Sequence, residues 1–286
     1  MEYVINNIAV SVVTGLRHYD KAKAVANTWG KHFEHIFYHS STPDGSVPIT
    51  ALSWPKPHLR GRFKTPPLNL DDSENYHSGT YKQAYGLQDM QRRNLGVDWY
   101  YLADCDTFAH PRNLAKALEA LNPNEIVYAG GDIVRGEAIK DQWPNMENPT
   151  YAGGGSGIIL SKKLVDEWCP KIETSLLHWA NPDVSQNKWW ATDAFFGYEI
   201  HRLFGVTTTE LPGFYSHSYE HYCPIPQEGK DKIELHRTPS GEHVDISRNN
   251  PFIDNPVAFH YIKPPAMEKL YQYAKDGQPP FHKSQF

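Results

Sequence analysis

The sequence lacks the features that mark several common functional classes. It contains three cysteines, Cys105, Cys169 and Cys223, and no C-x-x-C pair, which argues against a structural zinc site and a disulfide framework. With 28 basic and 33 acidic residues, the net charge of −5 leaves no basic stripe of the kind that binds nucleic acid. The apolar run near the N-terminus is too short for a membrane span and has no basic flank typical of a signal peptide. We therefore expect neither a nucleic-acid partner nor a membrane span in this chain.

The N-terminal residues, MEYVINNIAVSVVTG, have the pattern of a first β-strand. If Met1 is the natural start, we expect a cytoplasmic protein that works with its thiols reduced. If this chain was trimmed from a longer one, an anchor could have been removed, and the lumen of the Golgi or endoplasmic reticulum is then the expected location.

Strand and helix patterns alternate along the chain, which indicates an α/β fold. We predict strands at residues 8–15, 35–40, 98–103, 125–131 and 257–264, and helices at 20–30, 80–95, 109–121, 162–168 and 192–205. Residues 41–80 and 212–256 are rich in proline and polar residues and have little periodicity, which is typical of long surface loops. We therefore expect residues 1–286 to form a single domain with two loop excursions.

Two aspartates end the apolar run VDWYYLA. Burying an unpaired carboxylate costs several kcal/mol, so Asp104 and Asp106 are expected to be solvated or to bind something. Because side chains alternate along a strand, we expect these two to point to one side and Cys105 to point away. At the carboxyl end of a parallel strand they would face the ligand crevice of an α/β sheet, where Mg²⁺ or Mn²⁺ suits such oxygen ligands. The alternative is that they cap the helix that follows.

A glycine-rich segment, YAGGGSG, spans residues 151–157. It does not match the phosphate loop G-x-x-x-x-G-K-[ST]. Glycine lets the backbone come close to a ligand or to another segment. Gly154 and Gly155 are therefore candidate ligand contacts, and a tight turn without a ligand is the alternative.

Two further residues have both a structural and a functional interpretation. Asp193 lies in the first turn of a predicted helix, where the helix dipole favours an acidic residue, and where it could also act as a general base. His260 lies in VAFHYIKP, where it is either a core histidine or a metal ligand.

In chain order, TG…TWG…IFYHS, WYYLADCDTFAHPRNL, YAGGGSGIILSKKL, TDAFFGYEI and AFHYIKP resemble a known family. It is the group of Fringe and core 1 β-1,3-galactosyltransferase-like enzymes in glycosyltransferase family 31. The resemblance covers about residues 8–264. It implies a GT-A fold, with a Rossmann-like mixed sheet flanked by helices, a nucleotide-sugar donor and an inverting mechanism.

The resemblance also implies roles for residues. Asp106 takes the metal-ligand position and Asp104 lies toward the donor, while Cys105 replaces the middle carboxylate of the family's triplet. Asp193 takes the position of the catalytic base. His260 takes the position of the metal-binding histidine.

The nucleotide side departs more from the family. Thr14 and Gly15 match its donor-binding turn, but Lys21 replaces an arginine, which keeps the charge and loses the planar fork. His39 stands where an aspartate is common, and Thr192 replaces the first residue of an acidic pair.

We therefore expect an enzyme that uses Mn²⁺ or Mg²⁺ to transfer a hexose or pentose from a UDP-sugar, with inversion, to a hydroxyl of a glycan or glycoconjugate. The family's linkage is β-1,3. A non-catalytic relative that binds nucleotide sugars or carbohydrate is the alternative, because the triplet and the acidic pair are altered. A metal-dependent nucleotidyltransferase shares only the acidic metal chemistry.

Overall fold

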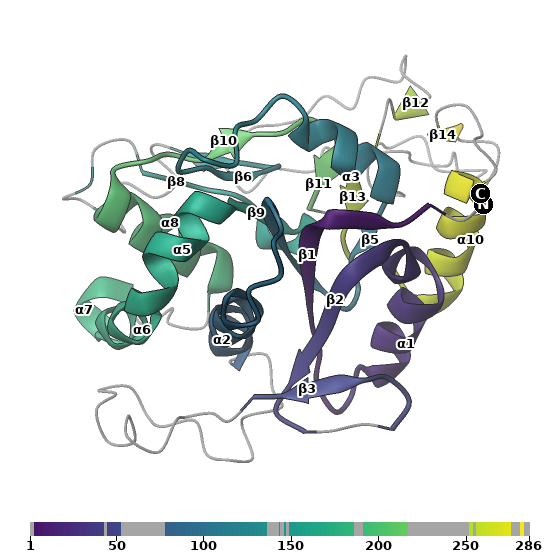
Figure 1. Ribbon diagram of the computed structural model, residues 1–286, viewed down its shortest axis with the longest axis horizontal. Helices are drawn as coiled ribbons and strands as arrows, with labels where there is room; N and C mark the ends of the chain where they lie inside the picture. The colour runs from purple at the N-terminus through teal and green to yellow at the C-terminus, as the bar shows by residue number, and fades with distance from the viewer. Residues whose placement is uncertain are drawn as a thin grey trace, which may run out of the picture.

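A seven-stranded mixed sheet forms the centre of the protein (Figure 1). The computed structural model describes residues 3–42, 45–52, 78–135, 143, 146, 149–185, 191–216, 252–253, 256–275 and 281–282. Across the sheet, the strands are β10 (Thr209–Glu210), β6 (Tyr128–Gly130), β9 (Ile158–Ser161), β4 (Trp99–Asp104), β1 (Ile5–Val13), β2 (Phe33–Ser40) and β3 (Ile49–Ala51).

The parallel strands β1, β2 and β4 bring their carboxyl ends to one edge of the sheet. Val13, at the end of β1, pairs with His39 of β2 on one side and with Asp104 of β4 on the other. Strand β9 runs antiparallel to both β4 and β6. Asp104, the first residue of the segment Asp104–Cys105–Asp106 (DCD), therefore lies at the edge where parallel sheets bind their ligands.

Helices cover both faces of this sheet (Figure 1). One group consists of α1 (Tyr19–Asn27), α3 (Pro111–Leu118) and α10 (Pro264–Lys275). The other consists of α2 (Gly79–Arg92), α5 (Lys162–Trp168), α6 (Ile172–Trp179), α7 (Pro182–Ser185) and α8 (Thr192–Phe204). Tyr101 and Ala103 of β4 belong to the hydrophobic cluster on the first side, and Tyr100 and Leu102 belong to the cluster on the second. A strand buried on both faces explains why WYYLA has no polar alternation.

A second, three-stranded sheet is built from β11 (Phe214–Tyr215), β13 (Ala258–Phe259) and β5 (Phe108–Ala109), with β13 in the middle. Strand β13 is antiparallel to β5, and Phe259 pairs with Phe108. The residue after β13 and the residues before β5 therefore lie at the same end of this sheet. Two smaller ladders join β7 (Val134–Arg135) to β8 (Thr150–Tyr151) and β12 (Phe252–Ile253) to β14 (Phe281–His282).

The predicted α/β class, a Rossmann-like mixed sheet flanked by helices, is confirmed. The helix predicted at 192–205 begins at Thr192 and ends before Gly205, which caps it with φ 69°. The sequence pattern did not indicate α10, which begins at Pro264 and ends at Lys275. Its two prolines fall in the first turn, where a missing N–H is tolerated, and Met267 and Leu270 are buried.

The predicted loop excursions lie largely outside the described residues. Within residues 41–80, the described part includes β3, which the sequence pattern did not indicate. Residues 53–77 and 217–251 are outside the described part. Among the described helices, none combines the length and the apolar character that crossing a membrane requires.

Trp29, which follows α1, is hydrogen-bonded to the segment directly after Asp106. Its side chain is fully buried, and the indole N–H donates a hydrogen bond of 3.0 Å to the carbonyl oxygen of Thr107. This bond holds Thr107, and with it the turn after β4, against the 3-10 helix at Trp29–His32.

Replacing Trp29 by Phe is expected to lower the free energy of unfolding by about 2–4 kcal/mol, since a ring volume is lost and a buried carbonyl loses its donor. Phe33→Leu, at a buried neighbour that uses no side-chain hydrogen bond, is the matched control and should cost less than about 1.5 kcal/mol. Urea unfolding measures both variants. Equal losses in the two would show that the indole hydrogen bond contributes nothing.

Candidate functional site

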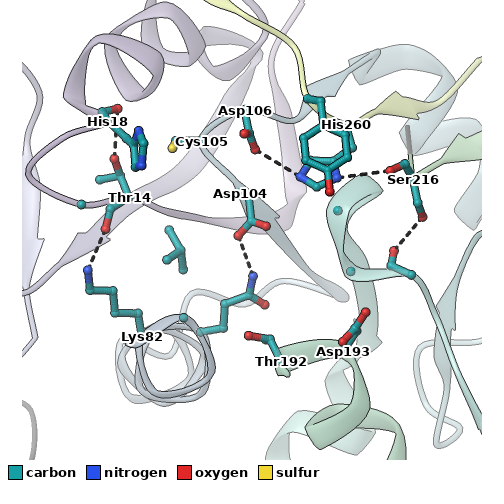
Figure 2. Close-up of a pocket in the computed structure, with 18 of the residues that line it drawn as sticks. Thr14, His18, Lys82, Asp104, Cys105, Asp106, Thr192, Asp193, Ser216 and His260 are labelled. Carbon is teal, nitrogen blue, oxygen red and sulfur yellow. Dashed lines mark hydrogen bonds and ion pairs between the residues drawn. The ribbon is translucent and has the colours of Figure 1, made fainter. Parts of the chain in front are cut away.

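A pocket of about 490 Å³ opens at the carboxyl edge of the sheet. All the residues that the sequence identified as site candidates line it (Figure 2). These are Thr14, Gly15, Lys21, Asp104, Cys105, Asp106, Gly154, Gly155, Asp193 and His260. Segments that are far apart in the chain thus meet in one cavity.

Asp104, Asp106 and His260 form a cluster with the composition of a metal site. One potential ligand atom from each lies within 4.8 Å of the others, and His260 Nε2 is 3.3 Å from Asp106 Oδ1. Two carboxylates and one imidazole are a donor set that suits Mn²⁺, and the carboxylates also suit Mg²⁺. Neither aspartate caps α3, because the side chain of His110 accepts the hydrogen bond from Asn113 N at that helix end. The capping alternative is therefore wrong.

The small sheet and a tight turn bring the cluster together. The backbone N–H of Thr107 donates to the carbonyl of Asp104 at 3.0 Å, which closes the turn around Cys105 and Asp106. The N–H of Ile262 donates to the carbonyl of Asp106 at 2.9 Å. The chain after β13 is thus fastened to the turn, and His260 is held facing Asp106.

A second set of hydrogen bonds orients the His260 ring. Its Nδ1 lies 3.2 Å from the carbonyl oxygen of Ser216, which can only accept, so Nδ1 carries the hydrogen and Nε2 faces Asp106. The N–H of Ser216 donates in turn to Asp132 Oδ2 at 2.6 Å. Such support for the second ring nitrogen is common for metal-binding histidines.

Opposite charges in the pocket shift the pKa values of its groups. Burial acts to raise the pKa of Asp106, but hydrogen bonds and charges from His260 and Lys21 outweigh it and lower the pKa well below the usual range. Burial, followed by the charge of Asp106, raises the pKa of Asp104 to about 6. Burial lowers the pKa of His260, yet the hydrogen bond to Asp106 and the two carboxylate charges raise it overall. A cation at the cluster would favour the ionised form of both carboxylates.

Lys21 reaches the cluster from α1. Its Nζ donates to Asp106 Oδ2 at 2.9 Å, and although burial acts to lower the Lys21 pKa, Asp106 raises it overall. The lysine thus keeps a full positive charge beside the carboxylates. This is a single point contact, as expected for a lysine in an arginine position.

The prediction that Cys105 points away from the pocket is wrong. The residue is buried and lines the pocket, and Figure 2 shows its sulfur near Thr14. Strand β4 ends at Asp104, so side-chain alternation no longer applies to the turn that follows. Asp104 and Asp106 still face one cluster because the turn, and not the pleat, directs them.

His39 does not line the pocket. It is fully buried between the sheet and α2, where its Nδ1 lies 2.7 Å from Ser11 Oγ and its Nε2 lies 3.3 Å from Asp89 Oδ2. The aspartate that is common at this position is therefore replaced by a histidine that ties β2 to α2.

The glycine-rich segment allows two functional side chains to approach the backbone. A Cβ on Gly155 would lie 1.9 Å from His260 Nδ1, and a Cβ on Gly154 would lie 3.2 Å from the Cβ of Asp193. At the first distance the imidazole would have to move, so glycine at position 155 allows His260 to keep its place. The glycines thus allow side chains to approach a backbone that forms a 3-10 turn at Gly154–Ser156, and a ligand contact at Gly154 and Gly155 stays a prediction.

Asp193 lies in the first turn of α8, and its Oδ1 accepts from the N–H of Ala194 at 2.9 Å. Burial raises its pKa, and bonds from the backbone N–H groups of Ala194 and Gly154 partly offset that effect. The hydroxyl of the neighbouring Thr192 is 3.3 Å from that of Thr80. Thr192, which stands where the resemblance leads us to expect an acidic residue, thus forms a hydrogen bond to α2.

Helix α2 contributes two pocket residues that the sequence did not indicate. Lys82 is buried and its Nζ donates to the carbonyl of Thr14 at 3.1 Å, while Gln83 Nε2 donates to Asp104 Oδ1 at 3.1 Å. Both fall on one helical stripe with Gly79 and Gly86, and this stripe faces inward. Polar residues on a buried stripe were the available signal.

Solved glycosyltransferase structures match over most of their length. A glycosyltransferase involved in glycosylation of the major capsid of PBCV-1 shares 11% identity, with 92% of this chain and 99% of that chain covered and a TM-score of 0.45. The galactosyltransferase LgtC in complex with donor and acceptor sugar analogues shares 13% identity, with 94% and 95% covered and a TM-score of 0.45. An active-site mutant of LgtC gives 12% identity and a TM-score of 0.48, with the same coverage. Matches this distant do not bear on substrate or mechanism.

A sequence comparison is more specific. The family model described as Fringe-like matches residues 4–235, a range that holds the DCD turn, the glycine-rich segment and Asp193. The match covers most of the chain and agrees with the family resemblance of the motifs. The protein belongs to the Fringe-like family.

Proposed function

We propose that this Fringe-like protein is a metal-dependent inverting glycosyltransferase. It moves a sugar from a UDP-sugar to a hydroxyl of a glycan or glycoconjugate and forms a β linkage, β-1,3 being the linkage of the group it resembles. Asp106 and His260 would hold Mn²⁺ or Mg²⁺, Asp104 and Lys21 would lie on the donor side, and Asp193 would act as the general base.

One observation carries this proposal. Three potential metal ligands and a lysine meet in a pocket that a separate carboxylate, Asp193, also lines. Figure 2 shows Asp106 and His260 together, with Asp193 apart from them across the pocket. A transferase needs such a division, because the diphosphate must leave on one side while a base works on the other.

On the donor side, Lys21 lies where a departing diphosphate would need positive charge, and a bound divalent ion would supply more charge to the same oxygens. Thr14 and Gly15 lie at the carboxyl end of β1 and contribute a turn for the nucleotide. Lys82 holds that turn through the Thr14 carbonyl.

On the acceptor side, the Asp193 carboxylate takes the hydroxyl proton as the acceptor oxygen attacks the anomeric carbon. The new C–O bond forms as the bond from the anomeric carbon to the diphosphate breaks, and UDP leaves with the electron pair. Attack from the face opposite to UDP inverts the configuration. The raised pKa of Asp193 makes its carboxylate a stronger base than a solvated one.

The non-catalytic alternative rests on Cys105 and Thr192, which replace family carboxylates. Both positions have a structural place here, because the Cys105 side chain is buried and the Thr192 hydroxyl lies 3.3 Å from that of Thr80. Neither replacement removes a residue from the metal cluster or from the base position, which favours the enzyme.

Replacing Asp106 by Ala is expected to abolish the metal-dependent part of UDP binding. Calorimetry with UDP in Mn²⁺ and in EDTA should show roughly a 100-fold loss of affinity in Mn²⁺, since even changes behind a metal ligand cost 10–100-fold. Cys105→Ser is the control for the same turn and should cost far less. A full response to Mn²⁺ in Asp106→Ala would remove the cluster from the mechanism.

Replacing Gly155 by Ala tests the positioning of His260 without touching a ligand. The new methyl group would displace the imidazole, so the Mn²⁺-dependent gain in UDP affinity should fall by about 10-fold or more. Gly45→Ala is the matched control, because a Cβ there meets nothing within 4 Å. If both variants keep the full gain, His260 is not held in place by this glycine.

Replacing Asp193 by Asn is expected to reduce transfer by about 10²–10⁴-fold, the range for a general base, while the affinity for UDP in Mn²⁺ stays within about 3-fold. A carboxyl whose pKa is raised by folding destabilises the folded state when ionised, and this penalty is present at pH 7 and disappears in acid. Neutral Asn should therefore leave the unfolding midpoint at pH 7 unchanged or higher.

The control for Asp193 is Asp183→Asn, which changes an exposed aspartate in the first turn of α7. It should transfer sugar at the normal rate. If Asp193→Asn also transfers normally and only loses stability, the residue is a helix-end carboxylate and not a base.

A further inference from the structure

Gln83 is a buried polar residue of α2 that the proposed mechanism does not use. It is 3% exposed and lines the pocket. It lies one turn after Gly79, where a Cβ would be 3.3 Å from Thr192 Oγ1. Gln83 therefore lies in the part of the pocket between Asp104 and the start of α8.

The hydrogen bond to Asp104 fixes the orientation of the Gln83 amide. Nε2 donates to Asp104 Oδ1 at 3.1 Å. An ionised carboxylate can only accept, so the reverse orientation would set two acceptor oxygens against each other. The amide oxygen Oε1 is thus directed away from Asp104.

Among the described residues, none provides a hydrogen-bond donor to Gln83 Oε1, although this atom is buried. A buried acceptor without a partner costs free energy, and such atoms in folded proteins call for an explanation. The terminal torsion of glutamine is broad, so a small rotation brings Oε1 toward a group in the pocket at little cost. The missing partner must be a donor, and a hydroxyl group is the donor that a sugar offers.

The position of Gln83 in the pocket indicates that the sugar of the donor, and not its nucleotide base, supplies the hydrogen bond to Oε1. The turn at Thr14 and Gly15, together with Lys82, lies at the proposed nucleotide end of the pocket, whereas Gln83 contacts Asp104 and lies one helical turn after Gly79, which approaches Thr192. Under the proposed function, the anomeric carbon lies between Asp104 and Asp193. We propose that Gln83 determines donor specificity: Nε2 positions Asp104, and Oε1 accepts a hydrogen bond from one hydroxyl of the transferred sugar.

This inference rests on the proposed function, and its test separates the two. The ligands are UDP, UDP-galactose, UDP-glucose, UDP-N-acetylglucosamine and UDP-xylose, titrated calorimetrically in Mn²⁺ into the full chain. The measured quantity is the affinity for the best UDP-sugar divided by the affinity for UDP. In Gln83→Met this ratio should fall by about 10-fold, as for one lost hydrogen bond, and dividing by the affinity for UDP removes the effect that a displaced Asp104 has on the nucleotide and the metal.

Gln88→Met is the matched control. Gln88 is buried on the same helix, but its Nε2 donates to the carbonyl of Cys169, outside the pocket. Its ratio should equal that of the wild-type chain. Because Gln83→Met removes an unpaired buried oxygen, its unfolding midpoint should not fall further than that of Gln88→Met, whereas a purely structural role predicts the opposite.

Deoxyfluoro analogues of the best donor sugar test the same hydrogen bond in the wild-type chain, so this test does not depend on a variant that folds. In the wild-type chain, replacing one particular hydroxyl by fluorine, which cannot donate, should lower affinity by about 10-fold, and in Gln83→Met the same analogue should lose nothing further. Equal ratios in Gln83→Met and Gln88→Met, or no sensitive hydroxyl in the wild-type chain, would overturn the role of Gln83 and leave the function standing. Failure of the wild-type chain to bind UDP and every UDP-sugar in Mn²⁺ would overturn both.

Discussion

The site depends on the antiparallel pairing of two short strands, β5 and β13. This pairing sets Phe108 opposite Phe259, and so it brings Asp106, from the first half of the chain, to His260, near its end. The hydrogen bond from the N–H of Ile262 to the carbonyl of Asp106 holds the chain after β13 against the turn before β5. Without this small sheet, the large sheet would carry two aspartates at a strand end but no complete ligand set.

The glycine-rich segment then contacts one residue from each side of the proposed chemistry. Gly155 makes room for His260, the proposed metal ligand, and Gly154 lies against Asp193, the proposed base, so adjacent backbone positions support both residues. The distance between them is set by backbone, which is more rigid than a pair of long side chains. Helix α2 closes the pocket with Lys82 and Gln83, one directed to the nucleotide turn and the other to Asp104.

Much of this arrangement follows from the sequence, for physical reasons that differ from residue to residue. Asp104 and Asp106 were recognisable because carboxylates directly after a doubly buried strand need a partner. Asp193 and His260 had equally good structural explanations as isolated residues, and only the order of motifs along the chain, as in the Fringe-like family, connected them. The direction of Cys105 was wrong because a strand's alternation ends where the strand ends. Ser216 could not be predicted, since its position depends on contacts between segments that no local pattern encodes, whereas Gln83 had a signal as a polar residue on a buried helical stripe.

The central claim is that the pocket transfers a sugar and does not only bind one. Its most direct test is the release of UDP from the four UDP-sugars by the wild-type chain, with a panel of p-nitrophenyl glycosides as acceptors, in Mn²⁺ and in EDTA. The account predicts acceptor-stimulated UDP release with at least one donor in Mn²⁺, none in EDTA, and a product whose new anomeric bond has the inverted configuration by NMR. Tight, Mn²⁺-dependent binding of a UDP-sugar with no release of UDP under any acceptor, or a product that retains the donor's configuration, would contradict it.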